Sequence, residues 1–385
     1  MVDGQRIRSF EVDDVSREQL PEITLSGSPF ERGLQHGESF DTEVAANVDC
    51  YLSVFEHYGA SREDVLEEAV QYHDVIENQN ESYAQEVRGV AEGSDLPLSH
   101  VALLNARYEV IYSAYKDKAE SLGSETPPPA DGCTSFGVRP EVTADGRTYV
   151  GQNWDWLASV EETMVVTTVE RTDGPNHVAV TEAGIVGGKM GVNEAGIGLV
   201  VNGLVTPQDG ETPYQKPFHV RCREILEADR FDRAIAPVVE SDRTCAGNFL
   251  IGHHVGELID LEAAPETVNY LSPENGILTH ANHFEDQTDV ESSLERLIPH
   301  TLCRGPRLRR LLEQERGAID VEVLKGALRD HFDFPASICH HVDPELPAEE
   351  HEQTNVSVIL DLEDRSLLAT SGPPCERAYR RYRCP

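Results

Sequence analysis

The sequence predicts an α+β protein in which stacked antiparallel sheets carry helices on their outer faces. Apolar residues recur at helical spacing from about Ser61 to Lys118, the period changes to about two after Cys133, and helical and strand-like blocks then alternate. The segment AESLGSETPPPADG at 119–132 separates the first two regions, and its three consecutive prolines fit neither a helix nor a central strand. We therefore expect an exposed linker that ends at Cys133.

The individual elements follow from periodicity and turn residues. Residues 1–20 are polar and expected to be loose, whereas Ser61 and Asp64 have the spacing of a helix N-cap. Further helices are predicted at 81–91 and 98–115. The second part is predicted to hold strands at 148–156, 163–171, 177–183, 187–205, 247–262, 266–272 and 276–284, helices at 217–240, 291–316 and 320–331, and a closing strand pair at 356–362 and 366–372.

The chain is strongly acidic, with 69 Asp and Glu against 32 Lys and Arg and a net charge of −37. Lysine is rare and occurs at positions 116, 118, 189, 216 and 325. Acidic residues spread along the whole chain keep a surface hydrated and self-repelling in concentrated salt, so we expect the cytoplasm of a salt-accumulating halophile. An ordinary acidic enzyme is the alternative. Such a surface argues against binding nucleic acid or an anionic membrane.

No targeting or metal-binding pattern is evident. The start, MVDGQRIRSF, is polar, and no stretch approaches the roughly 18 apolar residues of a membrane helix, so we expect a soluble cytoplasmic protein. The eight cysteines are scattered without a Cys-x-x-Cys pair, which favours reduced thiols. Neither His280 with His283 nor His340 with His341 and His351 has the spacing of a metal motif. We therefore expect no metal and no cofactor.

The junction between Gly132 and Cys133 is the first motif that carries chemistry. Glycine permits close approach of the Cys133 thiol to the preceding carbonyl, and attack there would move the acyl group from nitrogen to sulfur. Hydrolysis would free an α-amine with a pKa of about 7.7–8.0, a base near neutral pH, beside a thiol with a pKa of about 8.5. One residue would then supply both nucleophile and base. The alternative is a buried cysteine at the start of a strand.

Asp155 lies in the second motif, Gly151-Gln152-Asn153-Trp154-Asp155-Trp156, on the strand that follows Cys133 and one turn. A hairpin would bring Asp155 next to Cys133, where a carboxylate can hold and orient the protonated amine. The alternative is a surface aspartate between two core tryptophans.

Several segments carry a family resemblance. DGCTSFGV and GRTYVGQNWDW, together with TEAGIVGGKMGVNEAGIGLVVNGL, THANHF, SICHH and VSVILDL, resemble the isopenicillin-N acyltransferase family, which comprises cysteine-type N-terminal-nucleophile enzymes that mature by cutting before the cysteine. SPFERGLQHG, EVRGVAEGSDLPL and NARYE resemble its propeptide half. The resemblance covers nearly the whole chain beyond about residue 20. It implies a four-layer αββα sandwich, with 1–132 as the α subunit and 133–385 as the catalytic β subunit of one folded domain.

The resemblance also implies roles for single residues. Cys133 matches the nucleophile, Asp155 the acid that orients its amine, and Asn282 the amide that helps to form the oxyanion hole; without the resemblance, Asn282 reads as a turn residue. His340 stands where the family usually has Arg, so recognition of a substrate carboxylate and the pH profile can differ. Trp154 is expected to form part of the core and of the pocket wall.

These features together predict an autoproteolytic enzyme that cleaves Gly132–Cys133 and transfers acyl groups from small amides or thioesters to water or an amine. Two alternatives stay open. One is an amidase like bile-salt hydrolase or penicillin-V acylase, although those relatives expose the cysteine after losing only Met or a short leader, whereas 132 residues precede Cys133 here. The other is a catalytically silent binding protein on the same scaffold. The natural substrate and the oligomeric state are left open.

Overall fold

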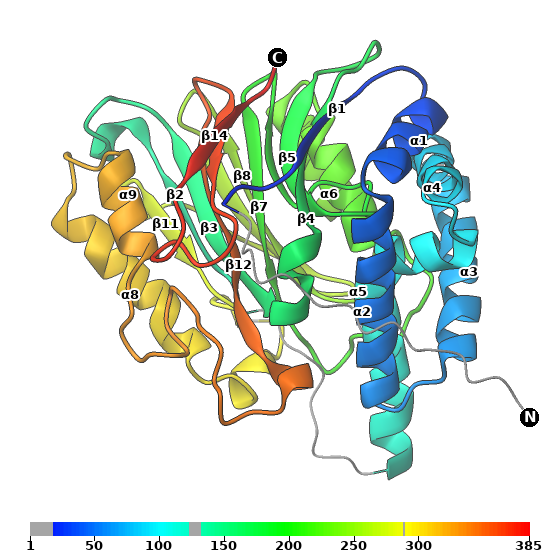
Figure 1. The fold of residues 1–385 in the computed structure, drawn as a ribbon. Helices are drawn as coiled ribbons and strands as arrows, with labels where there is room; N and C mark the ends of the chain where they lie inside the picture. Colours follow the sequence, from blue (N-terminus) through cyan, green and yellow to red (C-terminus); the bar gives the residue numbers. More distant parts are fainter. Residues whose placement is uncertain (1–17, 123–131, 288) are drawn as a thin grey trace, which may run out of the picture.

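The computed structural model describes residues 18–122, 132–287 and 289–385. Two β-sheets lie face to face, and helices cover the outer surface of each (Figure 1). The fold is therefore the four-layer αββα sandwich that the family resemblance implied. Of the linker predicted at 119–132, residues 123–131 lie outside the described part, as do residues 1–17 of the expected loose start. Among the described helices, none combines the length and apolar character needed to cross a bilayer.

The helices form two groups on opposite sides of the sheets. The first group packs around the eight-stranded sheet, and the second, α8 and α9, covers the six-stranded sheet (Figure 1). The helices are α1 (Pro29–Ser39), α2 (Asp41–His57), α3 (Arg62–Gln79), α4 (Glu81–Gly93), α5 (Leu98–Leu122), α6 (Phe218–Leu226), α7 (Phe231–Val239), α8 (Thr301–Gln314) and α9 (Val321–Leu328).

The eight-stranded sheet has the order β1-β4-β5-β6-β7-β8-β9-β10, and the six-stranded sheet the order β11-β2-β3-β12-β13-β14. Apart from the parallel pair β1–β4, the pairings are antiparallel. The strands are β1 (Glu22–Leu25), β2 (Thr134–Val138), β3 (Tyr149–Leu157), β4 (Met164–Val169), β5 (His177–Glu182), β6 (Met190–Asn193), β7 (Ile197–Gly203), β8 (Gly247–His253), β9 (Leu258–Ala263), β10 (Val268–Leu271), β11 (Ile277–His280), β12 (Glu352–Asp361), β13 (Ser366–Ala369) and β14 (Arg380–Arg383).

Most central strands are buried on both faces, because each sheet lies between the other sheet and a helix layer. All residues of β2, β3 and β7 are buried. Their sequences accordingly lack the strict alternation of a half-exposed strand. Polar side chains on these strands must then find partners inside the protein. Gln152 of β3, for example, bonds the main chain of Val201 in the opposite sheet through both of its amide atoms.

Helices α1 and α4 cross unusually closely because each places two glycines at the contact. A Cβ atom added to Gly33 of α1 would lie 2.0 Å from the carbonyl oxygen of Glu86, and one added to Gly89 of α4 would lie 2.2 Å from that of Phe30. The two helix backbones therefore touch directly, and any side chain at these positions would force them apart. Helix α1 begins with a capping box between Ser28 and Glu31.

Several predicted elements differ from the observed ones. The block at 217–240 is two helices, α6 and α7; the strand-like blocks at 187–205 and 247–262 are the hairpins β6–β7 and β8–β9. Turns with glycine at positive φ, Gly196 and Gly256, divide these hairpins. The helix expected from 291 begins at Thr301. The sequence analysis assigned no elements to α1, α2 and the two edge strands β1 and β14, which are only 4 residues long.

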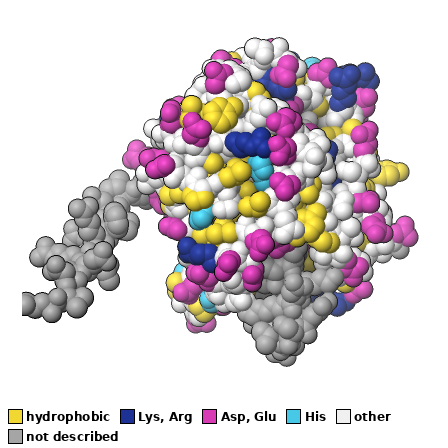
Figure 2. All heavy atoms as spheres, turned by 90° about the vertical axis from the view of Figure 1, so that its right-hand side faces the viewer, with side chains coloured by type: hydrophobic (Ala, Val, Ile, Leu, Met, Phe, Trp, Pro, Cys, Tyr) yellow, Lys and Arg dark blue, Asp and Glu magenta, His cyan; other side chains and the backbone are white. Residues whose placement is uncertain are grey.

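Acidic side chains are spread over the face that carries the N-terminal helices, whereas Lys and Arg side chains gather there in few places (Figure 2). This distribution agrees with the even spread of acidic residues in the sequence and with a surface dominated by one sign of charge. Growth in high salt remains a prediction.

Candidate active site around Cys133

The hairpin of β2 and β3 brings Gly132, Cys133 and Asp155 together. Thr134 pairs with Asn153 at the end of the ladder, and the Gly132 amide donates a hydrogen bond of 3.2 Å to the main-chain oxygen of Asp155. Cys133 therefore lies opposite Trp154 in the ladder. The hairpin predicted from the sequence is confirmed, because two antiparallel neighbours with this register leave no room for another strand between them.

Asp155 is completely buried, and the Thr354 hydroxyl holds its carboxylate. The Thr354 hydroxyl donates a hydrogen bond of 2.5 Å to Asp155 Oδ1 and accepts one of 3.0 Å from the His340 amide. The Thr354 amide in turn donates to the His340 carbonyl. Since the hydroxyl has a single proton and His340 occupies one of its acceptor sites, the proton points to the carboxylate. This arrangement fixes the direction in which Asp155 faces.

Arg304 of α8 is the central cation of this site. Its Nη1 contacts the carbonyl oxygens of Gly132 and Cys133, the latter at 2.6 Å, and the Thr134 hydroxyl at 2.7 Å. Its Nη2 donates a hydrogen bond of 2.7 Å to Asn282 Oδ1. Burial lowers the pKa of Arg304, whereas Asp155 and Cys133 act in the opposite direction. A guanidinium stays charged even so, so the carbonyl before Cys133 faces a permanent positive charge.

Arg304 was not among the site residues predicted from the sequence, although a signal was present. Thr301, Arg304, Leu308 and Leu312 follow one another at helical spacing and form the buried side of α8. A charged residue within an otherwise apolar stripe is seldom buried without a specific partner. The partners, however, lie 172 residues away at Gly132 and 22 residues away at Asn282, and no local pattern reveals such distances.

Asn282 lies just beyond the end of β11, two residues after His280. Its amide nitrogen Nδ2 donates a hydrogen bond of 3.1 Å to the Gly203 carbonyl, and its main-chain N–H donates one of 2.7 Å to the Thr301 hydroxyl. Because Oδ1 accepts a hydrogen bond from Arg304, the orientation of the Asn282 amide is fixed. Its oxygen faces the guanidinium, and its NH₂ group is the donor. Asn282 and the Gly132–Cys133 junction thus contact the same guanidinium.

His340 lies in the same region but does not replace an arginine in charge. Burial lowers the pKa of His340 to about 3, with Arg304 as the next cause, and the same two causes lower that of His300 to about 3. Arg304 Nε donates a hydrogen bond of 3.1 Å to His300 Nδ1, which fixes this nitrogen as an acceptor. Both imidazoles are therefore neutral near pH 7, and Arg304 supplies the positive charge.

Trp154 has its neighbours on the opposite side of β3 from those of Asp155, in the layer between the two sheets. Lys189 Nζ lies 3.9 Å from the centre of the Trp154 ring, and this amine also pairs with the buried Glu182. Trp154 and Cys133 belong to the same cluster of buried residues. Trp154 is thus part of the core, as expected, and its place in a pocket wall stays a prediction. Cys133, Asp155 and Asn282 are each fully buried.

Two of the histidines whose spacing matched no metal motif have protein partners. His280 Nε2 lies 2.9 Å from the Glu262 carboxylate, and His351 Nε2 contacts the Leu346 carbonyl at 3.0 Å. A different group of histidines and cysteines does converge in the described part of the chain, and it is treated below.

Comparisons with known proteins show the family to which the chain belongs. Residues 142–367, more than half of the chain, match the family described as acyl-coenzyme A:6-aminopenicillanic acid acyl-transferase. The matched region includes Asp155, Asn282 and Arg304. The "acyl-coenzyme A:6-aminopenicillanic-acid-acyltransferase 40 kDa form" of Emericella nidulans is 26% identical over 319 residues, which cover 82% of this chain and 84% of that protein.

Two solved structures that the chain matches have low sequence identity to it. A variant of the conjugated bile acid hydrolase from Clostridium perfringens is 13% identical with a TM-score of 0.44, covering 66% of this chain and 97% of its own. The N-acylethanolamine-hydrolyzing acid amidase ortholog of Caenorhabditis elegans is also 13% identical, with a TM-score of 0.44 and coverages of 60% and 93%. From the match over more than half of its length, the chain belongs to the acyl-coenzyme A:6-aminopenicillanic acid acyl-transferase family.

Proposed function

We propose that this protein is an autoproteolytic cysteine amidohydrolase or acyltransferase. It cleaves its own Gly132–Cys133 bond and then transfers acyl groups from small amides or thioesters, through a Cys133 thioester, to water or an amine. The observation that carries the proposal is the contact of the Arg304 guanidinium with the Gly132 carbonyl oxygen, beside Cys133 and Asp155. A cation at this oxygen stabilises the negative charge that develops there when a nucleophile attacks the carbonyl carbon.

The cleavage reaction has two balanced steps. In the first, the Cys133 sulfur bonds to the Gly132 carbonyl carbon, the peptide C–N bond breaks, and the thiol proton passes to the departing nitrogen. In the second, water splits the thioester; its hydroxyl group goes to Gly132 as a carboxylic acid and its hydrogen returns to the sulfur. The new α-amine, with a pKa of about 7.7–8.0, lies next to the Asp155 carboxylate, which orients it.

Turnover of substrate then uses the same groups. The α-amine accepts the thiol proton while the sulfur attacks the acyl carbon, and the leaving amine or thiol takes that proton away. The Asn282 amide carries a second N–H besides the one bound to Gly203, and this donor stabilises the substrate oxyanion. Water or an amine finally releases the acyl group from sulfur. Because Cys133 is fully buried in the uncut chain, cleavage also opens the path by which substrate enters.

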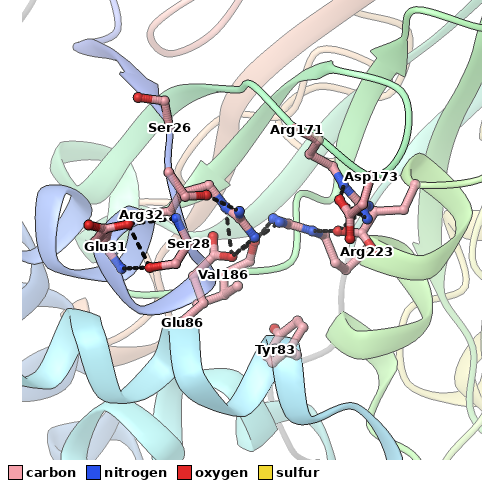
Figure 3. A network of polar contacts seen from close by, with 12 residues as sticks. Ser26, Ser28, Glu31, Arg32, Tyr83, Glu86, Arg171, Asp173, Val186 and Arg223 are labelled. Atoms are coloured by element: carbon pink, nitrogen blue, oxygen red, sulfur yellow. Dashed lines mark hydrogen bonds and ion pairs between the residues drawn. The ribbon is translucent and has the colours of Figure 1, made fainter.

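The segments 1–132 and 133–385 are proposed to remain one folded unit as α and β subunits. A buried ion network joins them: Glu86 of α4 accepts hydrogen bonds from Arg32 of α1 at 2.9 Å and from Arg223 of α6 at 3.1 Å (Figure 3). A second buried pair links Arg107 of α5 to Glu182 of β5 at 2.9 Å. Separating the segments would leave these charges buried without partners or expose them, which is costly either way.

The first prediction concerns the two roles of Cys133. In the wild type, intact mass should show two fragments, one of which begins Cys-Thr-Ser-Phe. The Cys133→Ala chain should stay uncut and inactive while it remains folded, and Cys133→Ser should cut slowly and turn over poorly, because a hydroxyl lacks a thiolate-like population near neutral pH. Asp155→Asn should keep the fold and lower turnover. Cys384→Ala serves as the control with both activities intact.

Activity is measured with an acyl p-nitroanilide for amide hydrolysis and with acyl-coenzyme A plus 6-aminopenicillanic acid for acyl transfer, which separates water from amine as the acceptor. A wild-type chain that stays whole, or a Cys133→Ala variant that hydrolyses the anilide at the wild-type rate, would refute the proposal.

A further inference from the structure

Four potential metal ligands converge beyond the end of α9, apart from the contacts of Arg304. The four are His331, Cys339, His341 and Cys375. His331 follows α9, and Cys375 lies between β13 and β14. One nitrogen or sulfur atom of each lies within 4.8 Å of the others. Three separate chain segments therefore bring two imidazoles and two thiols to one point.

Four of the six distances among these atoms match the edges of a coordination tetrahedron, and the other two, from His331 to the sulfurs, are at most 4.8 Å. The two Nε2 atoms of His331 and His341 are 3.1 Å apart, and the sulfurs of Cys339 and Cys375 are 3.5 Å apart. His341 Nε2 lies 3.5 Å and 3.3 Å from these two sulfurs. Zinc bonds nitrogen at about 2.0–2.1 Å and sulfur at about 2.3 Å, which gives tetrahedral edges of about 3.3 Å for N–N, 3.5 Å for N–S and 3.8 Å for S–S. The observed distances fall within a few tenths of an ångström of these.

Hydrogen bonding alone does not account for this convergence. His341 Nε2 has three neighbours in the cluster, but an imidazole nitrogen carries either one proton or one lone pair. That single proton or lone pair can form a well-directed hydrogen bond with at most one of the three neighbours. A cation at the centre would accept one lone pair from each of the four atoms at once.

The surroundings fit a metal site as well. The other ring nitrogen of His341, Nδ1, lies 3.7 Å from the Glu376 carboxylate. A carboxylate at that position orients a metal-binding imidazole and raises its basicity. Cys339 is buried, whereas His331 and Cys375 are exposed, so the cluster has an anchored inner side and an open path for an ion.

We propose that His331, Cys339, His341 and Cys375 bind one Zn²⁺ as a closed structural site. Two thiol protons are released and two neutral imidazoles are retained, so the ion and its ligands carry no net charge. Four protein ligands fill the tetrahedron and leave no position for a reacting water, which assigns the ion a structural role.

The site would brace a loop that contacts the residues around Cys133. Between Cys339 and His341 lies His340, whose amide bonds the Thr354 hydroxyl, and this hydroxyl holds Asp155. Asn153, which lies on β3 with Asp155, donates a hydrogen bond of 2.7 Å to the Ile338 carbonyl. An ion that joins this loop to Cys375 and to the end of α9 would therefore limit how far Thr354 and Asp155 can move.

The metal content of the full-length protein is the direct test. After exhaustive dialysis against metal-free buffer, elemental mass spectrometry should find about one zinc per chain, and the Cys133→Ala background should contain the same amount, which keeps the result independent of the proposed enzyme activity. Cys375→Ser and His331→Ala should lose most of the zinc. Cys303→Ser removes another exposed cysteine and should retain it.

Two further readouts cover variants that fold poorly. Removing zinc from the wild type with a chelator should lower its melting temperature, and adding Zn²⁺ back should restore it. Co²⁺ added to the metal-free protein should give the thiolate charge-transfer and visible bands of a tetrahedral site, which Cys375→Ser should weaken. Absence of metal together with no response to added Zn²⁺ would overturn the proposal. So would a native mass lower by two hydrogens that maps to a Cys339–Cys375 disulfide.

Discussion

At the scale of single residues, Arg304 has the most contacts that bear on chemistry. The same guanidinium reaches the carbonyl of Gly132, the hydroxyl of Thr134 and the side chain of Asn282. The planar guanidinium donates from Nη1 to Gly132 and Thr134 and from Nη2 to Asn282. A lysine ammonium group cannot reproduce this geometry. We therefore expect both self-cleavage and substrate turnover to depend on Arg304.

Arg304→Lys keeps the charge and removes the fork. Cleavage at Gly132–Cys133 should slow by about 10²–10³-fold, the cost of losing one donor to a developing oxyanion. The cut fraction is followed by intact mass over time, with circular dichroism to verify folding. Arg309→Lys on the same helix alters an ion pair with the exposed Glu274, away from the Gly132–Cys133 junction, and should leave cleavage unchanged. If Arg304→Lys matured as fast as the wild type, the guanidinium would have no part in the reaction.

The buried histidines predict a dependence of stability on pH. Burial and Arg304 lower the pKa of His340 to about 3, far below the usual value near 6.5. Between these values the unfolded chain binds a proton that the folded chain excludes, so the free energy of unfolding falls as the pH falls below about 6.5. One such group contributes a slope of up to about 1.4 kcal/mol per pH unit.

His340→Gln should remove that contribution. Urea unfolding at constant KCl, measured between about pH 6.5 and 4.5, should give a shallower pH dependence for the variant than for the wild type. Equal slopes would mean that the imidazole gains its proton in the folded state without cost. The comparison of slopes holds even if the substitution lowers stability at every pH.

At the scale of secondary-structure elements, the contact of α1 with α4 shows how a helix pair can depend on the absence of side chains. Gly33→Ala would place a methyl group against the Glu86 carbonyl, and the backbone of α4 cannot yield as a flexible side chain would. We expect the free energy of unfolding to fall by about 2–3 kcal/mol. Gly326→Ala in α9 is the matched control, because a Cβ there meets no atom within 4 Å. It should raise stability by about 0.5–1 kcal/mol.

Denaturant unfolding of both variants gives the two free energies. If Gly33→Ala were stabilised as much as Gly326→Ala, helix propensity and not the close approach of the two backbones would determine the effect.

The elements differ in how far the sequence could predict them. The Ser61 cap and the hairpin of β2 and β3 depend on residues near one another in the chain, and both are present. The split of 217–240 into two helices was not evident, because both halves share apolar helical spacing. Residues whose partners are distant were harder still. Arg304 binds Gly132 across 172 residues, and His341 lies 10 residues from His331, 2 from Cys339 and 34 from Cys375, a spacing that matches no short motif.

At the scale of the whole molecule, the net charge of −37 is the dominant property. Repulsion between acidic groups acts against the folded state at low ionic strength, and the Debye length shortens from about 10 Å at 0.1 M to about 3 Å at 1 M salt. The melting temperature should therefore rise from low to multimolar KCl. Sucrose at equal osmolality stabilises without screening and should raise it less. A melting temperature that does not change with KCl would refute the halophile prediction.

If Gly132–Cys133 is cleaved as proposed, the contact between Arg304 and the Gly132 carbonyl would also set an order of events during protein synthesis. The cleavage junction leaves the ribosome long before Arg304 does, since 172 residues separate them. At about 5–20 residues per second, synthesis of that stretch takes roughly 10–35 s. Through this interval the junction would lack its cation, so a nascent chain would stay whole. A chain that terminates early, before α8, would never mature, and the cell would release the nucleophile only from molecules translated beyond that helix.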